Sequence, residues 1–142
     1  MTDDWPYSYL DRVRYGDLDT NRHLNNVAVH QFFESARVAY MRALFPELDP
    51  LGREDSAFGM IFAETHVRFR SPGLYEDDLR THVRVEELKR SSVRLGFRIT
   101  CEDDGRVVAE GWGTLVGYDY ASGRAMALPE YVAERLRPPA GG

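Results

Sequence analysis

Residues 15–37 contain an unusual density of polar side chains of the kinds that take part in catalysis. Eight of them lie around the start and along the body of one predicted helix: Asp17, Asp19, Asn21, His23, Asn25, Asn26, Glu34 and Arg37. A loop that ends at a helix N-terminus places carboxylate, imidazole and amide groups beside backbone N–H groups that have no partner within the helix. Such an arrangement can activate a water molecule next to a developing oxyanion.

The run Asp-Leu-Asp-Thr-Asn that starts at Asp17 has some of the spacing of a calcium-binding loop. An EF-hand loop starting there needs glycine at position 22 and glutamate at position 28, and the chain has Arg22 and Ala28, which excludes this interpretation. The polar residues of the loop could also be turn-forming residues only, because Asp and Asn favour turns through local hydrogen bonds. That structural alternative stays open beside the catalytic one.

Glu34 lies within a second, narrower apolar stripe of the same predicted helix, on the side away from its main apolar face. The stripe is formed by Val27, Val38, Met41 and Phe45. A carboxylate among apolar side chains is expected to be partly buried and to need a partner. One interpretation is an ion pair with Arg37, one turn on. The other is a role in substrate binding, with the stripe contacting a second subunit or an acyl chain.

A short basic turn, Lys89-Arg90-Ser91-Ser92, separates two predicted strands. It is either an exposed turn or a site where Lys89 and Arg90 contact phosphate groups with support from the serine hydroxyls.

The histidines outside the loop give weaker signals. His30 could pair with Glu34 on a metal, but no third ligand lies nearby in the sequence, so no metal site is expected. His66 and His82 fall among arginines on the polar face of two predicted strands, where solvated side chains are the simpler interpretation.

The bulk properties limit the class of protein. The 142 residues fit one domain, 1–142, and 43% of them are apolar, which is enough for a hydrophobic core. The net charge of −5 argues against nucleic acid as the main partner. A single cysteine, Cys101, excludes an internal disulfide framework. The start of the chain lacks an apolar signal segment, and no apolar run is long enough to cross a membrane, so a cytoplasmic protein is expected.

The period of the apolar residues predicts one strand and then one long helix in the first third of the chain. Residues 7–15 form the predicted strand, and a helix is expected from an N-cap at Asn25 or Asn26 to about Phe45, where Pro46 ends it. Its wide apolar face comprises Ala28, Val29, Phe32, Phe33, Ala36, Ala39, Tyr40, Ala43 and Leu44. Residues 46–58 are expected to be an irregular connection.

From residue 61 onward the period becomes two, which is typical of strands with one wet face. The alternating sets are Ile61, Ala63, Thr65, Val67 and Phe69; Leu79, Thr81, Val83 and Val85; and Val93, Leu95, Phe97 and Ile99. Asp104-Gly105 predicts a hairpin turn before an interior strand at about 107–118, and residues 129–137 predict a short helix. Short links between strands imply antiparallel pairing. We therefore expect an α+β fold in which a five-stranded antiparallel sheet wraps around one helix. Its open edges favour a homo-oligomer.

Two motifs resemble those of a known family. Residues 19–26 read Asp-Thr-Asn-Arg-His-Leu-Asn-Asn, and residues 34–37 read Glu-Ser-Ala-Arg. Together they resemble the signature of hotdog-fold acyl thioesterases of the 4-hydroxybenzoyl-CoA thioesterase superfamily. Residues 17–27 are also similar to plant thioesterases that act on acyl carrier protein (acyl-ACP). The resemblance continues through residues 69–72 and 77–79, so it covers nearly the whole chain.

This resemblance implies an enzyme that hydrolyses an acyl-CoA or acyl-ACP thioester as a dimer or tetramer of hotdog subunits, with no metal or cofactor required. The family's catalytic carboxylate falls on Asp19, and Asn21 and His23 match positions implicated in catalysis. Asp19 would activate water or attack directly, and a backbone N–H at the helix start would hold the thioester oxygen. The expected substrate-binding residues are Asn25, Asn26, Glu34, Lys89, Arg90 and Ser91.

The chain departs from many relatives at Val29, where they have an aromatic residue, usually tyrosine, and this affects the expected shape of the acyl pocket. Two alternatives remain. Hotdog hydratases resemble Asp-x-Asn-Pro-x-His, whereas here His23 follows Asp19 by four residues with no proline between them. A non-catalytic acyl-CoA binding protein is the second alternative, because a fold does not by itself define an activity.

Overall fold

The structure is a computed structural model that describes residues 5–46 and 58–137. The described residues form a sheet, two α-helices and one short 3-10 helix. In chain order these elements are β1 (Tyr7–Arg12), η1 (Tyr15–Asp17), α1 (Asn26–Leu44), β2 (Phe58–Phe69), β3 (Asp78–Leu88), β4 (Ser92–Cys101), β5 (Val107–Asp119), β6 (Arg124–Ala125) and α2 (Glu130–Leu136). Most of the predicted irregular connection, residues 47–57, lies outside the described residues.

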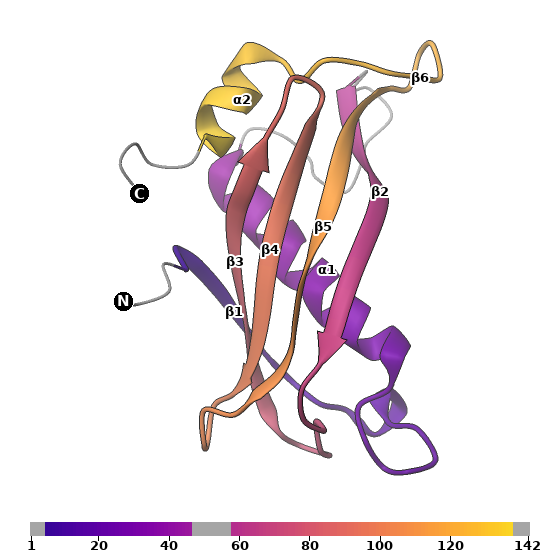
Figure 1. Cartoon of the computed structure of the whole chain (residues 1–142), viewed down its shortest axis with the longest axis vertical. Coiled ribbons are helices and arrows are strands. Elements are labelled where there is room, and N and C mark those ends of the chain that lie inside the picture. Colours follow the sequence, from indigo (N-terminus) through magenta and orange to yellow (C-terminus); the bar gives the residue numbers. More distant parts are fainter. Residues whose placement is uncertain (1–4, 47–57, 138–142) are drawn as a thin grey trace.

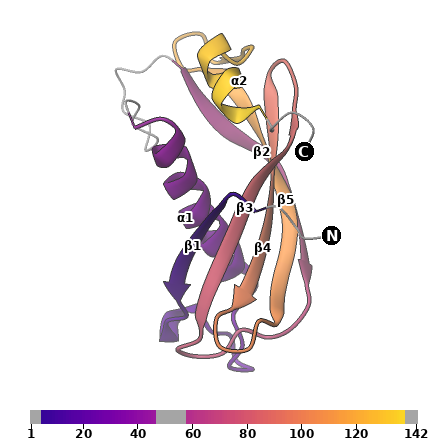
Figure 2. The ribbon, with the colours of Figure 1, turned by 90° about the vertical axis from the view of Figure 1, so that its left-hand side faces the viewer.

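All neighbouring strands are antiparallel, in the order β1-β3-β4-β5-β2, with β6 beside β5. Figure 1 shows α1 running along one face of this sheet, and the side view in Figure 2 shows that β1 lies close to the helix. The predicted α+β fold is confirmed. The sheet has six strands instead of five, because Arg124 and Ala125 pair with the end of β5. No helix in the described part of the chain is long and apolar enough to cross a membrane.

The main face of α1 forms the centre of the core, as its period predicts. Ala28, Val29, Phe32, Phe33, Ala36 and Tyr40 are buried. The helix packs chiefly against β1 and β3, and the ring of Phe33 stacks on Phe97 of β4 with centroids 4.3 Å apart. The helix ends at Leu44 because Pro46 disfavours a helical conformation in the residue before it.

The second apolar stripe of α1 is divided between core and surface. Met41 and Phe45 are buried within the protomer. Phe45 is covered by the C-terminal helix, where Tyr131 packs edge-on against it and the Arg135 guanidinium lies 5.2 Å from the ring centroid. Val27, at the other end, is 67% exposed. Val38, between them, is half-buried, so the last turn of the stripe is not available to a second subunit or an acyl chain.

The predicted inner faces of β3 and β4 are confirmed. Leu79, Val83, Leu95 and Ile99 are almost fully buried. The Asp104-Gly105 turn joins β4 to β5, with Gly105 at φ +76°, a left-handed conformation that suits glycine. β5 has neighbours on both sides, as expected for an interior strand, and α2 occupies the predicted C-terminal helix.

The predicted inner face of β2 is wrong in its first half. The pairing of β2 with β5 shifts register between Phe62 and Glu64, which leaves Ala63 as an extra, bulged residue. A bulge reverses which side chains face the core, so Phe62 packs against Phe33 while Ile61 is exposed. Val67 and Phe69, beyond the bulge, face the helix side as predicted, yet Phe69 is 54% exposed. β2 is therefore an edge strand whose inner face α1 covers at Phe62 but leaves exposed at Phe69.

The predicted first strand is too long. β1 ends at Arg12, and Val13 instead exchanges backbone hydrogen bonds with Glu76 and Asp77 before the chain turns into η1. This early end brings the loop that follows η1 to the start of α1.

Both tryptophans lie on the face of the sheet away from α1. The Trp112 ring is stacked on His66 and has the Arg94 guanidinium 3.9 Å from its centroid. The Trp5 ring likewise has the Arg84 guanidinium at 4.1 Å. This outer face therefore carries cation–π contacts and ion pairs, such as those of Glu110 with Arg70 and Arg98.

Candidate active site

The loop before α1 is a compact turn held by its own backbone. Leu18 and Leu24 form an isolated antiparallel bridge, and the Asp19 N–H donates to the His23 carbonyl at 2.8 Å. Arg22 has a left-handed conformation, with φ of 63°, at the tip of the turn. The loop projects from the lower end of the molecule in Figure 1.

The Asp19 carboxylate has a structural function in this turn. Its Oδ1 accepts the backbone N–H of Asn21 at 2.8 Å and that of His23 at 3.1 Å. The turn-forming alternative for Asp19 is therefore confirmed at one oxygen. The other oxygen, Oδ2, has no hydrogen-bond partner among the described residues. The Asn21 and His23 side chains are exposed at the same turn, so the three predicted catalytic residues do lie together.

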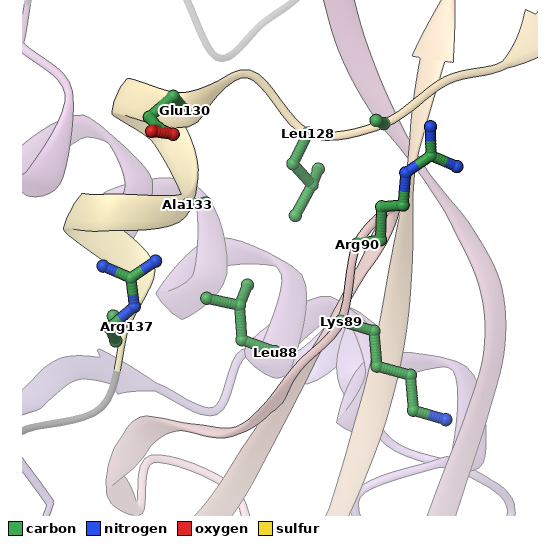
Figure 3. Close-up of a pocket in the computed structure, with 8 residues that line it drawn as sticks. Leu88, Lys89, Arg90, Leu128, Glu130, Ala133 and Arg137 are labelled. Atoms are coloured by element: carbon green, nitrogen blue, oxygen red, sulfur yellow. The ribbon is translucent and has the colours of Figure 1, made fainter.

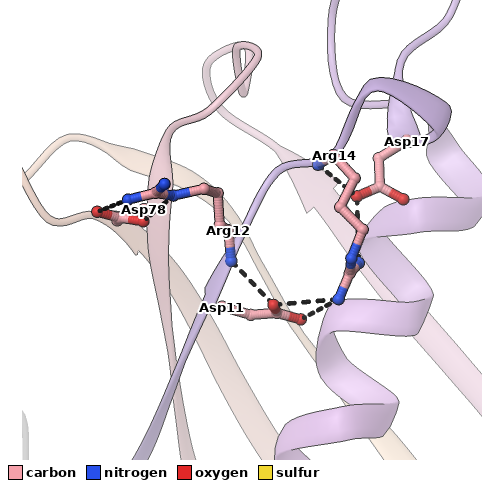
Figure 4. A network of polar contacts seen from close by, with 5 residues as sticks. All are labelled: Asp11, Arg12, Arg14, Asp17 and Asp78. Atoms are coloured by element: carbon pink, nitrogen blue, oxygen red, sulfur yellow. Dashed lines mark hydrogen bonds and ion pairs between the residues drawn. The ribbon is translucent and has the colours of Figure 1, made fainter.

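Asp17 anchors the loop and is the buried carboxylate of this region. It is 8% exposed, and its Oδ2 accepts the backbone N–H of Arg14 at 2.9 Å, with the Arg14 guanidinium 3.5 Å away. Arg14 also pairs with Asp11 (Figure 4). Alongside, a hydrogen bond from Arg12 lowers the pKa of Asp78. Asp17 is thus a structural residue. It differs from Asp19 in being buried, whereas Asp19 is exposed.

The helix start lies next to this turn. The Asn25 N–H donates to the Asp17 carbonyl at 2.8 Å, and Asp19 follows Asp17 by two residues in the same turn. Asn25 is the N-cap, as predicted, because its Oδ1 accepts the Ala28 N–H at 2.7 Å. The backbone N–H groups of Asn26 and Val27 have no acceptor among the described residues. The helix start therefore leaves two backbone donors without a protein acceptor in the described ranges.

Glu34 forms the ion pair with Arg37 that was one of its two interpretations, with Arg37 Nε 2.8 Å from Glu34 Oε1. The Glu34 side chain is 43% exposed and that of Arg37 only 17%. The Arg37 guanidinium also lies 5.0 Å from the ring centroid of Phe62. The ion pair therefore lies two turns beyond the helix start, with Arg37 in contact with β2.

The basic turn lies at the opposite end of the sheet from Asp19, beside α2 (Figure 1). β3 alone spans 11 residues, on the order of 30 Å, between the two ends. Lys89 and Arg90 line a hollow of about 530 Å³ between the turn and α2 (Figure 3). Lys89 and Ser91 also line a second hollow of about 320 Å³ on the outer face, with Arg94. One protomer does not bring these residues to Asp19.

One further polar residue, His30, lies next to the helix start and was not predicted as part of the site. His30 lies on α1 one turn after Asn26, with its Nδ1 3.0 Å from the Asn26 carbonyl oxygen and its Nε2 3.4 Å from Thr65 Oγ1 of β2. Its spacing of four residues from Asn26 is the signal that links it to the helix start. In the described ranges, no three His, Cys, Asp or Glu side chains are placed to hold a metal ion.

Comparison with known proteins gives the class. A family model described as the thioesterase-like superfamily matches residues 13–136. The chain therefore belongs to the thioesterase-like superfamily, and the expected enzyme class, a thioester hydrolase, is confirmed.

Individual relatives agree with this class. The chain is 29% identical over 132 residues to the long-chain acyl-CoA thioesterase FadM of Escherichia coli (strain K12), which covers 88% of this chain and 92% of FadM. A thioesterase from Thermus thermophilus, solved with coenzyme A and Zn, is 33% identical, with a TM-score of 0.80 over 95% of this chain and 100% of that one. These relatives support hydrolysis of acyl-CoA thioesters as the class of reaction.

A more distant neighbour confirms the fold. The structure of a 1,4-dihydroxy-2-naphthoyl-CoA thioesterase from Synechocystis superposes with a TM-score of 0.82 over 92% of this chain and 94% of that one, at 13% identity. The fold is thus the expected hotdog fold. The similarity of residues 17–27 to plant acyl-ACP thioesterases stays an expectation.

Proposed function

We propose that this chain, as a single hotdog domain over residues 1–142, hydrolyses an acyl-CoA thioester at the turn before α1. The observation that carries the proposal is an Asp19 Oδ2 without a partner among the described residues, in the turn that is hydrogen-bonded to the helix start where the N–H groups of Asn26 and Val27 also lack acceptors. Because Oδ1 is fixed by two backbone hydrogen bonds, the carboxylate has a defined orientation. A fixed carboxylate next to fixed oxyanion donors is what acyl transfer to water needs.

The proposed reaction balances without any further reagent. Asp19 Oδ2 takes a proton from water, and the water oxygen bonds to the thioester carbonyl carbon. The carbonyl electron pair moves to the oxygen, which the Asn26 and Val27 N–H groups hold. When this pair returns, the C–S bond breaks and the thiolate takes the proton from Asp19, leaving the free acid and the thiol. Direct attack by Asp19, with water then cleaving the acyl anhydride, is the second form of the same proposal.

Asn21 and His23 are proposed to orient the water or the acyl group. Both residues bind the Asp19 carboxylate through their backbone N–H groups. Their side chains are exposed at the turn. Asn25 supports the site as the helix cap, and Asn26 supports it through its backbone N–H. These roles need no metal or redox group.

A homodimer through β2 accounts for the separation between Asp19 and the basic turn. Near the start of β2, Met60 pairs with Gly117, whose N–H donates to the Ser91 carbonyl of the basic turn. The strand finishes at Phe69, at the end of the sheet where the loop before α1 lies. Antiparallel pairing of two β2 strands about a twofold axis places these two ends beside each other. Lys89, Arg90 and Ser91 of one protomer would then contact the carrier phosphates of a substrate bound at the other.

The carrier and the location are part of the same proposal. The paired phosphates of coenzyme A suit two cations and a serine, whereas acyl-ACP would also need a surface for the carrier protein. The single cysteine, Cys101, is buried and unpaired, which agrees with a reducing cytoplasm.

The test is a panel of acyl-CoA thioesters of different length, followed by thiol release, with wild type and Asp19→Asn. Turnover by wild type that falls at least a hundredfold in the variant supports the proposal. Tight binding of acyl-CoA with no turnover by wild type would instead identify a binding protein, and hydration of an enoyl-CoA would identify a hydratase.

A further inference from the structure

The contacts of His30 fix which of its ring nitrogens carries the proton. The Asn26 carbonyl oxygen can only accept a hydrogen bond, and it lies 3.0 Å from Nδ1 of His30. Nδ1 therefore carries the hydrogen, and in the neutral ring Nε2 is left with its lone pair. Nε2 faces β2, where the Thr65 hydroxyl lies 3.4 Å away, longer than a strong hydrogen bond. His30 thus presents a fixed acceptor at the edge of the sheet.

This acceptor lies on the same side of α1 as the proposed oxyanion donors. His30 follows Asn26 by four residues and Val27 by three, so the three residues are neighbours on the helix surface. Four residues of helix rise about 6 Å. An acyl group whose carbonyl is held at the helix start, and whose chain follows α1 along β2, reaches His30 after one turn.

The surroundings beyond His30 are also polar. One turn further along α1, Glu34 is held by Arg37, and the Arg37 guanidinium covers the Phe62 ring. A long alkyl chain in this direction would lie against an imidazole, a threonine hydroxyl and an ion pair, and would remove their water without replacing its hydrogen bonds. The apolar stripe that could have received such a chain is shortened, because Met41 and Phe45 at its end are buried within the protomer.

We infer that His30 and Thr65 determine acyl specificity, and that the site favours a compact acyl group with a hydroxyl or similar substituent about 6 Å from the thioester carbonyl over an unsubstituted alkyl chain. The substituent hydroxyl donates to His30 Nε2 and accepts a hydrogen bond from the Thr65 hydroxyl. This inference rests on the proposed function, because it assumes that the carbonyl binds at Asn26 and Val27.

The test compares two rigid substrates of equal shape, trans-4-hydroxycyclohexanecarbonyl-CoA and trans-4-methylcyclohexanecarbonyl-CoA. The saturated ring keeps the substituent from altering the reactivity of the thioester and prevents cyclisation. The quantity measured is the ratio of kcat/KM for the hydroxyl and methyl substrates, in wild type, His30→Leu, His30→Gln and Thr65→Val. Gln31→Leu, an equal loss of polarity at the adjacent exposed position of α1, is the matched control.

We expect the hydroxyl-to-methyl ratio to fall about three- to tenfold in His30→Leu, the range of one neutral hydrogen bond. His30→Gln, whose amide oxygen can occupy the place of Nε2, should retain most of the preference, Thr65→Val should lose a smaller part, and Gln31→Leu should match wild type. An unchanged ratio in His30→Leu, or an equal fall in Gln31→Leu, overturns the inference.

Failure of the proposed function gives a different result. If wild type hydrolyses neither substrate, the two non-hydrolysable thioether analogues are compared by calorimetry in the same variants. A hydroxyl preference in binding that depends on His30 then supports the inference without hydrolysis, and its absence overturns it.

Discussion

The Oδ1 atom of Asp19 lies 3.1 Å from the backbone nitrogen of His23, and the Asp19 N–H donates in return to the His23 carbonyl at 2.8 Å. One carboxylate thus holds the shape of the turn with one oxygen and leaves the other for the proposed chemistry. Because the two oxygens have different partners, two substitutions at this position can separate the structural role from the chemical one.

Asp19→Asn keeps a carbonyl oxygen that can accept the Asn21 and His23 N–H groups, but it removes the base. We expect kcat to fall a hundredfold or more with Tm within about 1 °C of wild type. Asp19→Ala loses both roles, so Tm should also fall by about 2–5 °C, as expected from lost hydrogen bonds in a domain of this size. Thiol-release kinetics and calorimetry measure the two effects. Near-normal turnover in Asp19→Asn would exclude Asp19 as base or nucleophile.

His23→Ala should lower kcat more than it raises KM, because a group that orients water or the acyl carbon acts mainly in the transition state. Asn21→Ala should behave in the same way, and each should have a smaller effect than Asp19→Asn. Steady-state kinetics on one acyl-CoA decide between the two roles. A change in KM alone would assign His23 to ground-state substrate binding.

The double substitution Lys89→Ala/Arg90→Ala should raise KM for an acyl-CoA roughly tenfold at low ionic strength and make KM less dependent on salt. A thioester of the same acid with N-acetylcysteamine, which lacks the phosphates, should be unaffected. Arg124→Ala, which removes an exposed cation from β6 in the same half of the sheet, is the control. Equal effects on both thioesters would show that the basic turn is only an exposed turn and does not bind the phosphates.

The protein should be at least a dimer of its 16.3 kDa chain at low micromolar concentration. β2 is an edge strand with Phe69 exposed at its end, and open edges of a sheet are normally paired. Phe69→Glu on β2 should weaken the dimer, whereas Leu10→Glu on the opposite edge strand should not, although both side chains are about half exposed in the protomer. Sedimentation velocity measures both. A fully active monomer would contradict the shared-site arrangement.

Acid should reduce stability partly through His82. Burial, with help from the charges of Arg80 and Arg98, lowers the pKa of His82 in the folded protein, and Glu102 opposes this shift. Below the unfolded pKa of about 6.5, the unfolded chain therefore binds more protons than the folded one. The free energy of unfolding should fall as pH decreases from about 7 to 5. His82→Gln should flatten this dependence in urea titrations at several pH values, and an unchanged slope would exclude His82 as its source.

Local patterns predicted those parts of the fold that depend on local sequence. The faces of β3 and β4 follow from strict alternation, and Asn25 caps α1 as its residue type and position suggest. The inner face of β2 could not be predicted, because the bulge at Ala63 is set by pairing with β5. The burial of Phe45 depends on α2, which lies near the other end of the sequence.

The site shows the same limit. The sequence groups Asp17 with Asp19, and only tertiary burial separates the anchor from the exposed carboxylate. The sequence does not show how far the basic turn lies from Asp19. That distance is set by the length of β3 in the folded sheet. His30 became informative only when its contact with Thr65, 35 residues away, was known.

The placement of Trp5 and Trp112 has an optical consequence. The chain has two tryptophans, and both lie on the outer face of the sheet, against Arg84 and Arg94. Their intrinsic fluorescence therefore reports the local environment of that face, on the other side of the sheet from α1. Emission should respond to unfolding and to any partner that covers the outer face, and should stay constant when an acyl group binds beside the helix. The two tryptophans thus form a built-in optical probe of the outer face, separate from the proposed acyl site beside α1.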